Sequence, residues 1–136
     1  MTSKASTNLS AGRDPILRTV PHPGDINTNG HIFGGWVLAQ MDIAGGILAT
    51  REALGPVATV AIEAMQFIAP VLLQDIISVY AEVDRRGRTS VAIRLDVIAT
   101  RGPAREEIRV TSGLFTFVAL DENHRPRTLP DPCAVG

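Results

Sequence analysis

Residues 34–50 contain one charged side chain, Asp42, among apolar and small residues. Residues 36–41 form a good helical run with no breaker before Asp42, and Gly55-Pro56 ends the helical segment 34–54 in the way that a C-terminal glycine followed by proline does. The pattern predicts one helix of about five to six turns, near 30 Å long. Because this helix is apolar nearly all round, we expect the rest of the protein to cover most of its sides.

After this helix the sequence changes to a two-residue periodicity. Strands are expected at residues 16–20, 57–69, 77–83, 91–99 and 107–120. Short turns at residues 85–88 and 101–105 join consecutive strands, which predicts an antiparallel meander. One curved antiparallel sheet wrapped around the helix, an α+β fold, satisfies both patterns. Such a small sheet leaves edges that a second copy would cover, so we expect at least a dimer.

The 136 residues fit one domain. We place it at residues 13–130, between a disordered segment 1–12 and a flexible tail 131–136. A net charge of −1 and an aromatic content of 4% do not support a nucleic-acid partner or a membrane partner. A single cysteine, Cys133, and an N-terminus without an apolar leader favour a cytoplasmic protein.

Asp42 is the first candidate for chemistry, because an ionised carboxylate is costly to bury without compensation. Within a helix it lies two turns after Gly34-Gly35, where it can serve as general base or nucleophile. The free amides at the helix start suit an oxygen that gains negative charge. Two alternatives remain: Asp42 caps a helix that begins at Ile43, or the glycines only allow a tight turn.

Other polar residues flank this region. His31, in the preceding loop, is a candidate to orient a substrate carbonyl or move a proton, although loop histidines are more often surface residues. Asn29, in the same loop, is also a candidate for the catalytic site, although Asn29-Gly30 is most simply a tight turn. Thr59 and Glu63 are expected to share one face of the next strand, where either one could face the acid across a dimer seam. The alternative is that Thr59 is an ordinary strand residue.

Residues 85–90 place three arginines and two hydroxyls at a turn. Arginine forks and hydroxyls suit phosphate groups, and the alternative is a solvated basic turn. The sequence has no Gly-x-Ser-x-Gly elbow, P-loop, dinucleotide fingerprint or Cys/His cluster. Serine-triad hydrolysis, nucleotide phosphoryl transfer and zinc chemistry therefore have no support.

Residues 25–36, Asp-Ile-Asn-Thr-Asn-Gly-His-Ile-Phe-Gly-Gly-Trp, continue to Gln40-Met41-Asp42. Together they resemble the signature of YciA-type acyl-CoA thioester hydrolases with the hot-dog fold. Residues 59–71, 87–90 and 115–119 are similar to later blocks of that family. The resemblance implies a long helix wrapped by a sheet, and homodimers that assemble into a homohexamer, a trimer of dimers. It also implies hydrolysis of acyl-CoA to a free acid and CoA.

The resemblance implies residue roles as well. Asp42 matches the catalytic acid, the amides near Gly35 match the oxyanion site, and Thr59 matches a position that faces the acid from the partner chain. The segment similar to the one that holds the CoA phosphates comprises Arg86, Gly87, Arg88, Thr89 and Ser90. No metal or redox cofactor is implied, and CoA enters as part of the substrate. Many family members have aspartate where this chain has His31, which replaces an anion with a neutral or cationic ring.

We therefore expect a cytosolic acyl-CoA thioesterase in which Asp42 activates water or attacks the thioester carbon itself. This hypothesis requires the carboxyl of Asp42 to lie inside the protein and to face a cavity. One rival is an acyl-thioester hydratase or dehydratase, for which His31 is the available histidine. Another is an acyl-CoA-binding regulator, which the lack of a helix-turn-helix or basic segment weakens.

Overall fold

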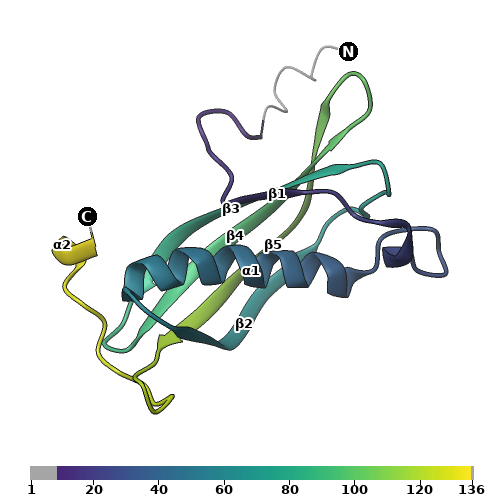
Figure 1. Cartoon of the computed structure of the whole chain (residues 1–136). Coiled ribbons are helices and arrows are strands. Elements are labelled where there is room, and N and C mark those ends of the chain that lie inside the picture. Colours follow the sequence, from purple (N-terminus) through teal and green to yellow (C-terminus); the bar gives the residue numbers. More distant parts are fainter. Residues whose placement is uncertain (1–8, 136) are drawn as a thin grey trace.

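In the computed structural model, which describes residues 9–135, one long helix lies across one face of a five-stranded antiparallel sheet (Figure 1). The helix is α1 (Gly34–Ala53), and the strands are β1 (Leu17–Thr19), β2 (Val57–Phe67), β3 (Ile76–Arg86), β4 (Ser90–Arg101) and β5 (Glu106–Ala119). Two short helices are η2 (Pro23–Asp25), before α1, and α2 (Pro132–Val135), near the C-terminus. The predicted α+β fold is confirmed.

The strands are arranged in the order β1-β3-β4-β5-β2. The expected meander is confirmed for β3, β4 and β5, which pair with one another in sequence. Strand β2 pairs instead with β5 and lies at the edge opposite β1, so residues 68–75 carry the chain past β5 and β4 to reach β3. Most residues of β2 are exposed along this free edge.

The hydrophobic core lies between α1 and the sheet. Helix residues that point to the sheet recur every three or four positions, as Met41, Ala44 and Leu48 do. They pack in one cluster with strand residues such as Leu95 and Phe117. The outer side of α1 remains apolar and open. Its large exposed side chains are Ile43 (51% exposed), Ile47 (41%) and Leu54 (57%). The expectation that most sides of the helix are covered is therefore wrong for the single chain, because the sheet covers one side only.

Strand β2 has two register shifts against β5, the first between Thr59 and Ala61. Each shift inserts an extra residue and interrupts the alternation of side chains. As a result Thr59 pairs with Phe117, on the helix-facing side, whereas Glu63 pairs with Leu114, on the opposite side. The expectation that Thr59 and Glu63 share a face is wrong, because the bulge at the intervening position reverses the alternation.

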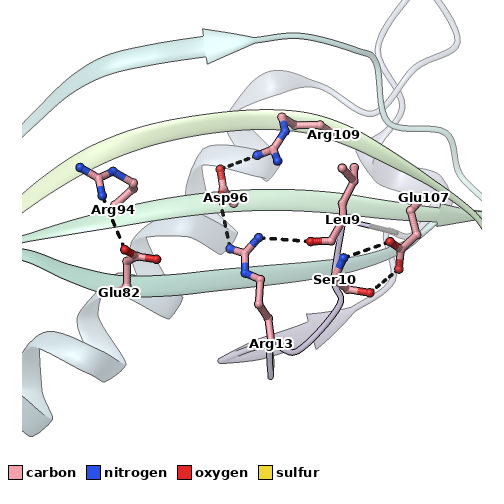
Figure 2. A network of polar contacts seen from close by, with 8 residues as sticks. All are labelled: Leu9, Ser10, Arg13, Glu82, Arg94, Asp96, Glu107 and Arg109. Atoms are coloured by element: carbon pink, nitrogen blue, oxygen red, sulfur yellow. Dashed lines mark hydrogen bonds and ion pairs between the residues drawn. The ribbon is translucent and has the colours of Figure 1, made fainter. Parts of the chain in front are cut away.

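The face of the sheet opposite α1 carries a polar network that holds the N-terminal segment (Figure 2). The Arg13 guanidinium lies 4.3 Å from the centre of the Tyr80 ring and donates to Asp96 at 3.1 Å. The amide and hydroxyl of Ser10 donate to the two carboxylate oxygens of Glu107, at 3.1 and 2.5 Å. Residues 9–12 thus form turns held to β5, in place of the disorder expected there, and residues 1–8 lie outside the described part of the chain.

The C-terminal segment contacts the C-terminal end of α1, and its short helix α2 also contacts α1 (Figure 1). The Arg127 side chain donates to the Ala53 carbonyl at 2.8 Å, which satisfies a carbonyl at the helix C-terminus with a cation. The Leu129 side chain is buried, and its amide donates to the carbonyl of Arg88 at 2.9 Å. Within the expected flexible tail 131–136, residues 132–135 form the short helix α2.

Candidate active site

Asp42 lies in the interior of α1, seven residues after Gly35. The N-cap residue of the helix is Phe33, so the alternative that Asp42 caps a helix beginning at Ile43 is wrong. The side chain of Asp42 is exposed in the single chain, which contradicts the expectation of a carboxyl held inside the protein. The reason is its position on the helix: Met41, the preceding residue, faces the sheet, whereas Asp42 faces the open angle between α1 and the free edge strand β2.

The carboxylate that this fold does bury is Asp75. Its side chain is fully buried and accepts two hydrogen bonds from the Arg101 guanidinium, at 2.8 and 2.7 Å. The hydrogen bond from Arg101 to Asp75 raises the pKa of Arg101 above its usual value, although burial opposes this. The pair fixes the start of β3 against the end of β4, which is a structural role that the sequence pattern did not reveal.

A cavity of about 540 Å³ opens beside Asp42. The residues that line it come from α1, β2 and β5, and they are Asp42, Ile43, Gly46, Ile47, Thr50, Val57, Thr59 and Phe117. Apolar side chains form much of the wall, and the carboxylate and two hydroxyls supply polar groups. The exposed acid therefore faces a cavity, as the hypothesis requires, although the cavity is open in the single chain.

Thr59 holds the carboxylate of Asp42. Its hydroxyl Oγ1 donates to Oδ1 of Asp42 at 2.6 Å, within the same chain. The hydrogen bond within one chain differs from the expectation that Thr59 reaches the acid from a partner chain. The reason is that Thr59 pairs with Phe117, whose side chain lies in the core beneath α1, so the threonine is directed to the helix side. Such a bond fixes the orientation of one carboxylate oxygen and leaves the second free for proton transfer.

The start of α1 supplies backbone amides. Phe33 has an extended backbone, with φ −70° and ψ 149°, and its carbonyl accepts from the Trp36 amide at 3.1 Å. Gly34 and Gly35 occupy the first two helical positions, whose amides precede any i−4 carbonyl of the helix. A Cβ on Gly35 would lie 3.3 Å from the Phe33 ring, so a larger residue at this position would require the ring to shift.

Gly35 and Asp42 lie near the same edge of the helix surface, because seven residues make almost two full turns. Their separation along the helix axis is about 10 Å. One bound carbonyl group cannot contact both from the same chain. The single chain therefore presents two half-sites, an amide end and an acid end.

The loop before α1 is organised by Asn27. Its Oδ1 accepts from the amides of Asn29 at 2.9 Å and His31 at 3.1 Å. The predicted turn at Asn29-Gly30 is confirmed, with Gly30 at φ 80°. His31 lines a second cavity, of about 250 Å³, together with Gly34 and Phe67. His31 is thus grouped with the amide end of the helix and is not in the Asp42 cavity. The role of Asn27 was missed, although an Asx turn before Asn-Gly was a usable signal.

The basic hairpin between β3 and β4 lies at the opposite end of α1. Arg86 pairs with Glu52, near the helix C-terminus, at 2.7 Å and donates to the Pro130 carbonyl at 2.5 Å. Of the residues predicted to hold the CoA phosphates, Arg86 is therefore engaged within the chain, whereas Arg88 is exposed. The amide of Gly87 donates to the Ser90 carbonyl at 2.7 Å, which makes the turn tight. Thr89 and Ser90 are half-buried at its base.

The hairpin is distant from Gly35. Glu52, which contacts the hairpin through Arg86, lies 17 positions after Gly35, about 26 Å along the axis. The single chain does not bring these two predicted binding regions together.

Within residues 9–135, no three His, Cys, Asp or Glu side chains form a group that could hold a metal ion. None of the helices in that range has the length and hydrophobicity of a membrane span.

Residues 29–104 match the family model of the thioesterase superfamily. The chain is 43% identical to the acyl-CoA thioester hydrolase YciA of Escherichia coli (strain K12) over 120 residues, which are 86% of this chain and 91% of that protein. Among solved structures it is similar to HI0827, "a hexameric broad specificity acyl-coenzyme A thioesterase", with a TM-score of 0.81 and 44% identity over 86% of this chain and 81% of that one. The hexameric thioesterase y2039 from Yersinia pestis gives a TM-score of 0.82 at 40% identity, over 87% of this chain and 96% of that one.

The chain therefore belongs to the thioesterase superfamily. Its long helix packed on an antiparallel sheet and its acid beside an open cavity are features of a member of this family. The resemblance to YciA-type hydrolases with the hot-dog fold is confirmed by these relatives.

Proposed function

We propose that this protein is an acyl-CoA thioesterase, which hydrolyses acyl-CoA to a free acid and CoA. The observation that carries the proposal is the carboxylate of Asp42, which accepts a hydrogen bond from Thr59 at 2.6 Å beside a cavity that apolar side chains help to line. Relatives that are 43–45% identical over most of the chain are named acyl-CoA thioester hydrolases. The cavity would take the acyl chain, and the carboxylate would act at the thioester carbon.

Two copies of the chain complete the site. If two α1 helices pack antiparallel about a two-fold axis that passes beside Leu38 and Ala39, Gly35 of one chain lies opposite Asp42 of the partner subunit. This arrangement removes the 10 Å gap between the half-sites of one chain. It also covers the exposed Ile43 and Ile47 side chains of the helix.

The free edge of β2 supports the same pairing. Its exposed side chains include Val60 (57% exposed), Ile62 (42%) and Phe67 (58%), and a long apolar edge strand is a template for pairing with another chain. Two β2 edges joined about the two-fold axis would make one continuous sheet. The relatives HI0827 and y2039 are hexameric, and we propose that three such dimers form a homohexamer.

In the completed site the thioester oxygen accepts hydrogen bonds from the amides of Gly34 and Gly35. These amides stabilise the negative charge that develops when the carbonyl carbon becomes tetrahedral. In one route Asp42 takes a proton from water as the water oxygen attacks the carbon. The C–S bond then breaks, and the CoA thiolate receives the proton. In the other route the carboxylate attacks the carbon, the C–S bond breaks and CoA leaves as the thiolate, which gives an anhydride. Water then cleaves the anhydride to the free acid and the Asp42 carboxylate, and its proton passes to the thiolate. His31 lines the cavity that Gly34 also lines, so in this proposal it would lie near that oxygen.

The hairpin at residues 85–90 would hold the phosphates of CoA. Arg86 forms an ion pair with Glu52 and a hydrogen bond with the Pro130 carbonyl, so it holds the hairpin in place. Arg88 is exposed and would reach the phosphate oxygens. Thr89 and Ser90 supply hydroxyls at its base. We place the enzyme in the cytoplasm, a compartment that suits a chain with one exposed free cysteine, Cys133.

Release of free thiol from acyl-CoA by the wild-type protein and by Asp42→Asn tests this function. Asparagine keeps an oxygen that can accept from Thr59, so the substitution removes the negative charge and little else. We expect kcat to fall by roughly two to four decades. Glu122→Gln, which removes an exposed carboxylate outside the cavity, is the matched control and should retain wild-type rates.

Three outcomes would overturn the proposal. Thiol release that is absent from the wild type but accompanied by CoA binding would identify a regulator. Hydration of an enoyl-CoA without thiol release would identify a hydratase. Thiol release that Asp42→Asn leaves unchanged would remove Asp42 from the chemistry.

A further inference from the structure

We infer that Gly46 determines the length of acyl chain that the enzyme accepts, an inference that rests on the proposed thioesterase function. Gly46 lies one helical turn after Asp42 and lines the same cavity. Asp42, Gly46 and Thr50 are spaced by four residues, so they form a row along one edge of α1. This row faces the angle between the helix and β2.

Gly45, the neighbouring glycine, is required for the packing of this helix. A Cβ on Gly45 would lie 2.9 Å from the Phe117 ring and 3.2 Å from Cδ1 of Leu95, so glycine there is needed for the helix to approach the sheet. A Cβ on Gly46 would lie 3.9 Å from its nearest neighbour, Cε2 of Phe117, which is an ordinary contact. Packing does not require glycine at this second position.

Glycine weakens the interior of a helix relative to alanine. At Gly46 an added Cβ would not clash with its neighbours, so close packing does not explain the glycine. The missing side chain instead leaves an open volume beside Asp42. The open volume belongs to the cavity of about 540 Å³. The absence of a side chain at Gly46 therefore contributes to substrate binding rather than to folding.

The row of Asp42, Gly46 and Thr50 also indicates that the acyl chain runs along α1 from Asp42 toward Thr50. The thioester carbon must lie at Asp42, and the cavity continues along the helix to Thr50, about 12 Å further on, with Val57 of β2 also in its lining. Ile43, Ile47 and Phe117 supply apolar wall on the way. An acetyl group ends before Gly46, whereas a medium or long acyl chain has to pass over it. A side chain at Gly46 would narrow the channel at that point.

The test compares Gly46→Ala and Gly46→Val with the wild type on acetyl-, butyryl-, octanoyl- and palmitoyl-CoA. We expect kcat/KM for acetyl-CoA to stay within about threefold of wild type in both variants. For octanoyl- and palmitoyl-CoA we expect a loss of tenfold or more in Gly46→Val, and a smaller loss in Gly46→Ala, because pockets discriminate by about one to two decades per methylene that does not fit. Alanine favours the helix, so Gly46→Ala should fold at least as well as the wild type.

Gly45→Ala is the matched control. It adds the same atom one residue earlier, against Phe117, and should lower the melting temperature and reduce activity on all four substrates by a similar factor. An unchanged chain-length profile in a folded Gly46→Val protein would overturn the inference while the thioesterase assignment stood. An equal loss on short and long substrates would also overturn it. A wild-type protein that releases no thiol from any of the four substrates would instead refute the proposed function, and the inference with it.

Discussion

Replacing Thr59 by valine removes the hydroxyl that donates to Oδ1 of Asp42 at 2.6 Å and keeps the branched shape of the side chain. A hydrogen bond to a charged group contributes about 1.5–3 kcal/mol, and the lower end applies here because both residues are exposed in the single chain. A loss of roughly 1.4 kcal/mol corresponds to a tenfold fall in rate. We therefore expect Thr59→Val to lower kcat about tenfold.

The assay is thiol release at saturating acyl-CoA, with kcat and KM measured separately. Thr59 lies at the acid end of the cavity and acts through Asp42, so the substitution should change kcat more than KM, and KM should stay within about twofold. Thr59→Ser keeps the donor and should restore most of the rate. In an Asp42→Asn background, Thr59→Val should have little further effect, since the two residues act as one unit. The reasoning is refuted if valine leaves kcat unchanged, or if serine is as damaging as valine.

Two further predictions concern substrate binding and pH. Arg88→Ala should raise KM for CoA esters severalfold and change kcat little, while short synthetic thioesters without the nucleotide are hydrolysed normally; an equal loss on both substrate types would exclude a phosphate role. Burial raises the pKa of the Glu107 carboxyl, but hydrogen bonds from Ser10 outweigh this and hold the pKa below its ordinary value of 4.5. The ionised, bonded carboxylate therefore stabilises the fold above about pH 4.5, and this contribution is lost as the pH falls through the lowered pKa. Ser10→Ala should lower the melting temperature by about 2–4 °C at pH 7, and the difference from wild type should shrink below pH 4.5; a difference that does not change with pH would contradict this.

The sequence was sufficient to predict α1 and the central strands, because their signals are local. The helix bounds follow from an unbroken apolar run and from Gly55-Pro56. The alternation after residue 76 places β3, β4 and β5 correctly. Strand β2 was found, but its bulge after Thr59 was not, because apolar and small residues predominate at both odd and even positions of this segment, so the sequence pattern does not fix the register.

The sequence identified candidate residues for the site, but it did not predict which of them are buried or which side chains they contact. Asp42 was expected to be buried because its helix is apolar on every side, and sequence pattern does not say which side the sheet covers and which a second chain would cover. The buried acid is Asp75, whose partner Arg101 lies 26 positions away and carries no local signal. In the same way, Arg86 could be recognised as basic, but its pairing with Glu52 depends on the tertiary fold.

The central claim is that Gly35 of one chain and Asp42 of the partner subunit form one site. Subunit mixing tests it with two variants that are each expected to be inactive as pure proteins: Asp42→Asn, which lacks the carboxylate, and Gly35→Pro, which lacks an amide at a helix position where proline is tolerated. In a mixed dimer one site would keep both the intact amide and the intact acid, so random mixing should restore about a quarter of wild-type thiol release. If each chain builds its own site, no mixed dimer contains an intact one, and activity that stays at the level of the separate variants would contradict the claim.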